Sequence, residues 1–131
     1  MEVTVVADAV VDLTTRALSK ALDCTAEQHR VAANNLANIE TPGYTARRGG
    51  FEDALRAAVR AEERGERPGA IETVRPSLEH TGDPAGPDGN NVSIETEMME
   101  LGEASLRFKV LTRMLHTKLQ MIGNAINDGR S

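Results

Sequence analysis

Apolar side chains recur every three or four residues near the start of the chain, the spacing that places them on one face of a helix. Between about Asp12 and Ile39, this face carries Leu18, Leu22, Thr25, His29, Ala32, Leu36 and Ile39. Asp12 is a suitable residue to begin the helix. Pro42 and Gly43 then end it, because proline cannot continue a helix and Gly43 fits the positive φ of a type II turn.

The same pattern is longer near the C-terminus, where it persists for more than four heptads. Its positions are Ile94, Met98, Leu101, Ser105, Phe108, Thr112, Leu115, Leu119, Ile122 and Ile126. Ser93 is a good N-cap, and Asp128 with Gly129 supplies a stop. An unbroken helix over this range is roughly 50 Å long, whereas a compact domain of this size is about 36 Å across. We therefore predict an elongated molecule with long terminal helices that pair with each other and then with other subunits.

The middle of the chain has a different composition. Phe51 to Arg64 is predicted to be a short amphipathic helix with Phe51, Leu55 and Val59 on one stripe. The polar sequence after it holds four of the five prolines. Within this part, we predict one short strand over residues 70–74 and a mobile loop over 80–90.

These patterns divide the chain into three parts of one elongated domain. Residues 1–46 form the first helix and its turn, 47–91 the short helix and a flexible connection, and 92–131 the C-terminal helix. The predicted fold class is mainly α. The two terminal helices pair as a coiled coil, and the connecting loop is irregular and partly β.

Composition argues against several functions. The net charge is −5 and no stretch is strongly basic, and only Tyr44, Phe51 and Phe108 are aromatic, so a nucleic-acid-binding surface is not expected. The three histidines lack the spacing of a metal motif, and the string after Asp88 lacks the glycine of a calcium loop. We expect no metal, no cofactor, no small-molecule substrate and no catalytic residue. The acidic residues that begin the C-terminal helix are expected to be solvated: Glu95, Glu97, Glu100 and Glu103.

Targeting signals are equally sparse. No apolar run approaches the ~20 residues of a transmembrane helix, and the N-terminal segment lacks the basic start of a secretory signal peptide. If this protein leaves the cytoplasm, we expect a route without a cleaved signal peptide. The single Cys24 cannot form an intramolecular disulfide and is expected to be a small buried residue.

Residues 33–44 read A-N-N-L-A-N-I-E-T-P-G-Y. Asparagine is a poor residue for a helix interior, because its amide competes for backbone hydrogen bonds, yet Asn34, Asn35 and Asn38 lie in the last turns of this helix. We expect these amides to serve contacts between chains. Simple capping of the helix end is the alternative, and a catalytic cluster is the least favoured.

This string resembles the N-terminal signature of the flagellar axial proteins, the rod, hook and hook-associated family, whose pattern is A-N-N-x-A-N-x-x-T-x-G-[YF]. The residues of this assembly motif are Ala33, Asn34, Asn35, Ala37, Asn38, Thr41, Pro42, Gly43 and Tyr44. Within the family, the chain is most similar to the proximal rod type. It is short, its G-F-E-D-A-L segment at 50–55 is similar to an F-x-x-x-L stretch, and D-G-N-N-V at 88–92 resembles the approach to the C-terminal helix. The segment Arg47 to Gly50 is more basic and glycine-rich than the family pattern.

The resemblance implies a structural component of the bacterial flagellar basal-body rod, located in the cell envelope, that polymerises through its terminal helices around the export channel. The implied partners are further copies, other rod proteins, the rod–ring adaptor at the inner-membrane ring and the flagellar type III export apparatus. Phe51 and Leu55 are an implied docking element for the export gate, or they only pack the short helix onto the long ones. The predicted seam of the C-terminal helix comprises Met98, Leu101, Phe108, Leu115, Leu119, Ile122 and Ile126.

A protein of another class remains as the alternative. A cytoplasmic helical adaptor or export chaperone that binds a partner helix would show similar apolar stripes. A rod subunit is expected to have partly disordered terminal helices before assembly, because an isolated helix gains most of its stability from packing.

Overall fold

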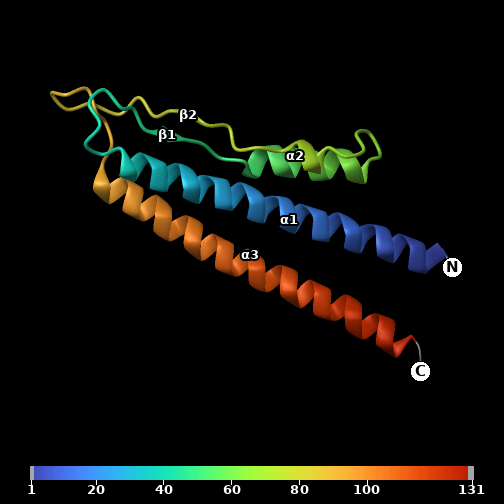
Figure 1. The fold of residues 1–131 in the computed structure, drawn as a ribbon. Helices are drawn as coiled ribbons and strands as arrows, with labels where there is room; N and C mark the ends of the chain where they lie inside the picture. The colour runs from blue at the N-terminus through green and yellow to red at the C-terminus, as the bar shows by residue number, and fades with distance from the viewer. Residues whose placement is uncertain (1, 130–131) are drawn as a thin grey trace.

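Two long antiparallel helices form the frame of the molecule in a computed structural model, which describes residues 2–129 and, for residues 2–12, the backbone alone (Figure 1). Helix α1 spans Glu2–Ala37 and helix α3 spans Ile94–Asp128. Both ends of the chain lie at the same end of this pair. The connecting segment leaves α1 and enters α3 at the other end, and its middle part runs back alongside α1. The predicted coiled-coil pairing of long terminal helices is confirmed.

The start of the first helix was predicted incorrectly. Helix α1 begins at Glu2, so Asp12 is an interior residue and not the N-cap. No glycine or proline interrupts residues 2–37, and the helix therefore continues through the valine-rich start. Its end matches the prediction: Gly43 has φ +74°, and the Tyr44 N–H donates to the Thr41 carbonyl at 3.2 Å, as in a type II turn.

Helix α3 is unbroken, as predicted. Ser93 caps its start by accepting a hydrogen bond from the Thr96 N–H at 3.4 Å, and the helix ends at Asp128. The face that it turns inward differs from the predicted one. Its buried positions are Glu97 and Ala104, and half-buried residues on the same face include Leu101, Leu111, Leu115, Lys118 and Ile122. Since four of these seven positions precede a predicted one by one residue, the centre of the inward face is rotated by about half of the angle between successive residues, or about 50°.

Helix α2, Glu52–Glu63, lies along α1 (Figure 1), close to the predicted short helix. A core of small and medium side chains joins it to α1 and to the segment that follows. Its buried members are Ala21, Cys24, Phe51, Ala58, Ala70, Ile71 and Val74. Burial of Cys24 raises the pKa of its thiol.

The predicted strand over residues 70–74 is wrong. Residues Ile71–Thr73 form a single 3-10 turn, η1. Ala70, Ile71 and Val74 are buried whereas Glu72 and Thr73 are exposed. This spacing belongs to a helical turn, since a strand would alternate buried and exposed positions.

A short two-stranded sheet, at positions that the sequence did not predict, lies against the first helix. Strand β1, Arg47–Arg48, pairs antiparallel with β2, Glu79–His80. The approach is close at Gly49, where an added Cβ would lie 1.8 Å from the Ser77 carbonyl oxygen, so only glycine fits. In the part of the chain that the structure describes, no helix is long and apolar enough to span a membrane.

Candidate assembly site

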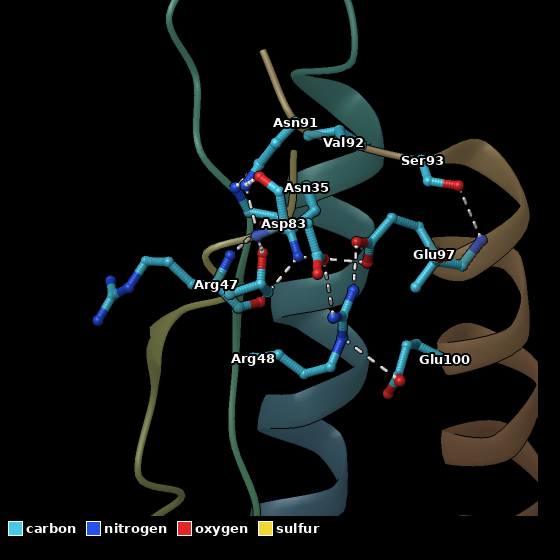
Figure 2. A network of polar contacts seen from close by, with 12 residues as sticks. Asn35, Arg47, Arg48, Asp83, Asn91, Val92, Ser93, Glu97 and Glu100 are labelled. Carbon is cyan, nitrogen blue, oxygen red and sulfur yellow. Dashed lines mark hydrogen bonds and ion pairs between the residues drawn. The ribbon is translucent and has the colours of Figure 1, made fainter. Parts of the chain in front are cut away.

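A polar joint lies at the end of the molecule where α1 ends and α3 begins (Figure 2). We use this name for the side chains of Asn35, Arg48, Asn90, Asn91 and Glu97 and the backbone that they bind. They come from α1, β1, the segment before α3 and α3 itself. Asn35 and Glu97 are each 1 % exposed, so their polar atoms need partners inside the protein.

Asn35 supplies hydrogen bonds in both directions. Its Nδ2 donates to the Arg47 carbonyl at 2.8 Å and to Glu97 Oε2 at 3.2 Å. Its Oδ1 accepts from the Arg47 N–H at 3.2 Å and from the Tyr44 hydroxyl at 3.0 Å. One buried amide therefore holds the backbone of β1 against α1 and also reaches α3.

Arg48 adds charge to this joint. Its Nη2 donates to Glu97 Oε1 at 2.8 Å, and its Nε and Nη1 lie 3.3 Å and 3.9 Å from carboxylate oxygens of Glu100 and Asp83. Because Glu97 is buried, removal of Arg48 would leave an uncompensated charge inside the protein, which is strongly destabilising. The ion pair thus holds the two-stranded sheet to the start of α3.

Asn90 and Asn91 link the turn after α1 to the segment before α3. The Asn90 amide donates to the carbonyls of Asn38 and Thr41, each at 2.8 Å. The Asn91 side chain accepts from the Ala46 N–H at 2.6 Å and donates to Thr81 Oγ1 and to the Asp83 carbonyl. These amides add to two backbone hydrogen bonds between the same segments, from the Gly43 N–H to the Asp88 carbonyl and from the Asn91 N–H to the Tyr44 carbonyl.

The assembly motif divides into two groups. Asn35 is buried, and Asn38 and Tyr44 are half-buried. Asn38 caps the helix end, since its Nδ2 donates to the Asn34 carbonyl at 2.8 Å and its Oδ1 accepts from the Thr41 hydroxyl at 3.1 Å. The remaining motif residues are exposed: Ala33, Asn34, Ala37, Thr41, Pro42 and Gly43. The structure therefore gives part of the motif a role within the chain, and the side chains of the other part are exposed at the surface.

The other predicted site residues also separate by exposure. Of the predicted seam, Leu101, Leu115 and Ile122 are half-buried, whereas Met98, Phe108, Leu119 and Ile126 are exposed. Phe51 is 3 % exposed and lies in the core with half-buried Leu55 against it.

Sequence reasoning missed Arg48 and assigned Glu97 to a solvated helix start, which is wrong. Glu97 lies four residues before Leu101 and seven before Ala104, so heptad spacing does place it on the inward face. Asn90 and Asn91 were noticed only as part of the D-G-N-N-V string, and no local pattern indicates which groups they bind.

A second polar cluster lies near the core, where Arg16 binds two carboxylates. Arg16 Nη2 lies 2.8 Å from Glu62 and 2.6 Å from Glu72, and Glu62 also accepts from the N–H groups of Gly69 and Ile71, each at 3.1 Å. Burial raises the pKa of Glu62, but these hydrogen bonds outweigh it and lower the pKa overall. The hydrogen bond from Arg16 lowers the pKa of Glu72 to about 2.

The amides and charges of the polar joint bind one another and the neighbouring backbone. Among the described residues, no group of three or more His, Cys, Asp or Glu side chains could hold a metal ion. The arrangement fixes how the helices, the turn after α1 and the two-stranded sheet meet.

A family of known proteins and several individual proteins are similar in sequence to this chain. The family described as flagella basal body rod protein matches residues 16–45, which include the assembly motif. The flagellar basal body rod protein FlgB of Bacillus subtilis (strain 168) is 26 % identical over 125 residues, covering 86 % of this chain and 92 % of that protein.

Two further FlgB proteins also align over most of the chain. The FlgB protein of Aeromonas hydrophila is 28 % identical and covers 81 % of this chain and 86 % of its own length. That of Salmonella typhimurium (strain LT2) is 27 % identical, with 90 % and 96 % covered. The family match over α1 and its turn, together with three relatives that align over most of the chain, makes this protein similar to the flagellar basal body rod proteins of the FlgB type.

Proposed function

We propose that this protein is a structural subunit of the proximal part of the flagellar basal-body rod, and that it polymerises through its terminal helices around the export channel. The three similar proteins are named flagellar basal body rod proteins. A structural role also suits a polar joint whose groups are occupied by contacts within the chain.

One observation carries the polymerisation step: α3 exposes apolar side chains on several faces. Among residues 13–129, whose side chains the structure describes, all ten exposed large apolar residues lie on this helix: Ile94, Met98, Met99, Leu106, Phe108, Val110, Met114, Leu119, Met121 and Ile126. A helix that is apolar around most of its circumference is typical of a buried helix. Burial of this surface between subunits would supply the driving force for association.

The partners follow from this role. They are further copies, other rod proteins and the rod–ring adaptor at the inner-membrane ring. The chain reaches them through the flagellar type III export apparatus, without cleavage of a signal peptide, and it catalyses no reaction. The adaptor alternative predicts a stable monomer or dimer that stays in the cytoplasm.

Complementation in a strain that lacks the gene tests the proposal. The wild-type chain should restore motility and be secreted at full length. Ala33→Arg places a large charge on the exposed part of the assembly motif and should abolish motility without loss of helicity or export. Ala57→Arg, the same change at an exposed position of α2, is the control and should leave motility intact. Normal motility in the deletion strain itself would refute the rod function.

The export element requires a separate test, because Phe51 is covered in the folded subunit. Docking at the gate therefore needs an unfolded chain, which suits passage through a narrow channel. Phe51→Ala should reduce secretion severalfold more than Ile71→Ala. Ile71 is a matched control, since it is 0 % exposed in the same core but lies outside the F-x-x-x-L element. Equal secretion of both variants would assign Phe51 to packing alone.

A further inference from the structure

Helix α3 has two neighbouring heptad seams, of which the chain itself covers one. The positions shared by both are Leu101, Phe108, Leu115 and Ile122. The covered seam combines them with Glu97, Ala104, Leu111 and Lys118. The open seam combines them with Met98, Ser105, Thr112, Leu119 and Ile126. Met98, Leu119 and Ile126 are 57 %, 51 % and 55 % exposed, and a helix with two adjacent seams is built to contact two other helices.

A groove marks the open seam where α3 meets α1. It has a volume of about 340 Å³ and is lined by Thr25, Ala26, His29, Ala104, Ser105, Phe108 and Lys109. Thr25 is fully buried, and its hydroxyl has no hydrogen-bond partner among the described residues. Beyond the groove, α3 diverges from α1 toward the two ends of the chain (Figure 1).

Charge is segregated along α3. Its acidic residues before residue 106 are Glu95, Glu97, Glu100 and Glu103, and no lysine or arginine lies among them. The next charged residues are all basic: Arg107, Lys109, Arg113 and Lys118. Among the described residues, Glu95, Glu103, Lys109, Arg113 and Lys118 form no ion pair. These charges are therefore available to a partner of opposite charge.

A second copy of this chain fits both features. The acidic and basic groups lie about 13 residues apart, or roughly 20 Å along the helix. A parallel copy displaced by two heptads, about 21 Å, keeps the seam in register and brings Glu95 beside the partner's Lys109. An antiparallel copy in full overlap would instead place Lys109 opposite the partner's Arg113, and like charges would repel.

We propose that the open seam of α3 is covered by α3 of a second copy, parallel and displaced by about two heptads. The apolar seam supplies affinity, and the charges select direction and displacement. Each copy offers both halves of this contact, so the arrangement is head-to-tail and stays open for further subunits. This inference rests on the proposed rod function and specifies how its subunits meet.

Disulfide cross-linking tests the displacement. Two tagged variants, Ser105→Cys and Leu119→Cys, are produced together in the deletion strain, and basal bodies are isolated after mild oxidation. A mixed disulfide between the two variants is expected, because these positions are two heptads apart on the open seam. The control pair, Glu103→Cys with Thr117→Cys, has the same displacement on the face away from the seam and should remain uncrosslinked.

Other outcomes separate this inference from the rod function. Disulfides between two copies of Ser105→Cys would indicate an unstaggered contact and overturn the proposed displacement. Cross-links to other rod proteins alone, or none in strains whose motility is restored, would overturn the second-copy partner and leave the rod function standing. Failure of the wild-type chain to restore motility would refute the rod function itself.

Charge reversal provides an independent readout. Glu95→Lys and Lys109→Glu each place two like charges together at the proposed contact. Each variant alone should reduce motility at least tenfold, whereas the two produced together should restore it, since each then finds a complementary neighbour. Full motility of either variant alone would contradict the role of charge, and failure of the pair to restore motility would contradict the complementarity.

Discussion

At the scale of single residues, Asn35 has the most demanding environment. Its amide donates to a backbone carbonyl and to a buried carboxylate, and its oxygen accepts from a backbone N–H and a hydroxyl. No other side chain of similar size offers donors and acceptors in this arrangement. The residue was singled out for contacts between chains, but its contacts in the structure are within the chain.

Asn35→Asp should therefore be destabilising. The substitution replaces the donor NH₂ by an acceptor oxygen that faces the Arg47 carbonyl and Glu97. We expect a loss of at least about 2 kcal/mol in the free energy of unfolding, measured by urea denaturation monitored by circular dichroism. Asn34→Asp is the matched control: the neighbouring side chain is exposed, so the change should stay within about 0.5 kcal/mol. Equal losses would mean that the polar joint is open to water in solution.

At the scale of elements, the Arg16 cluster decides how the segment after α2 returns to α1. Glu62 on α2 binds the backbone of residues 69 and 71, and Arg16 on α1 binds Glu62 and Glu72 together. These contacts position Ile71 in the core. They also account for the 3-10 turn where a strand was predicted, since the turn presents three side chains to one side.

This cluster makes stability depend on pH in acid. Folding lowers the pKa of Glu62 below its ordinary 4.5 and that of Glu72 to about 2. The unfolded chain therefore binds protons more readily, and stability is lost as the pH falls from about 4.5 toward 2. In Arg16→Met, thermal unfolding should vary less over this interval, because the main hydrogen-bond donor to both carboxylates is gone.

Arg56→Met is the control for this experiment. Arg56 pairs with Asp53 on the exposed surface of α2, and exposed pairs contribute little to stability. Its pH profile should match that of the wild-type chain. An unchanged profile in Arg16→Met would show that other carboxylates govern the acid transition.

At the scale of the whole molecule, the two halves of the helix pair differ in how well they are held. The end with the polar joint combines buried hydrogen bonds, an ion pair and the two-stranded sheet. Toward the termini, α3 exposes Leu119, Met121 and Ile126 at more than half of their area. Local opening requires least free energy where few apolar contacts are lost.

Hydrogen exchange should show this difference. In the isolated subunit, we expect the amides of residues 115–128 to exchange roughly tenfold or more faster than those of residues 98–111. In assembled basal bodies, the difference should largely disappear, because neighbouring subunits cover the helix. Uniform protection in the isolated subunit, with a cooperative thermal transition at micromolar concentration, would favour the adaptor alternative.

The sequence by itself determined the features that depend on neighbouring residues. Heptad spacing gave two long helices, Ser93 and Gly129 marked the limits of the second, and Pro42 with Gly43 marked the turn after the first. These are local effects, because helix periodicity, capping and turn conformation involve residues within a few positions of one another. The motif over residues 33–44 is likewise a local pattern of twelve consecutive residues, and its resemblance to the family could therefore be recognised without the structure.

Only the tertiary structure decided which face of α3 turns inward, that residues 47–48 and 79–80 pair, and that Glu97 is buried. The contacts responsible join residues far apart in sequence: Asn35 and Glu97 are 62 positions apart, and Arg48 and Glu97 are 49. Such pairs leave no periodic signal, and their partners are selected by packing of the whole chain. For α3 there was a further physical reason: with apolar residues around most of its circumference, periodicity alone could not distinguish the seam used within the chain from the one left open.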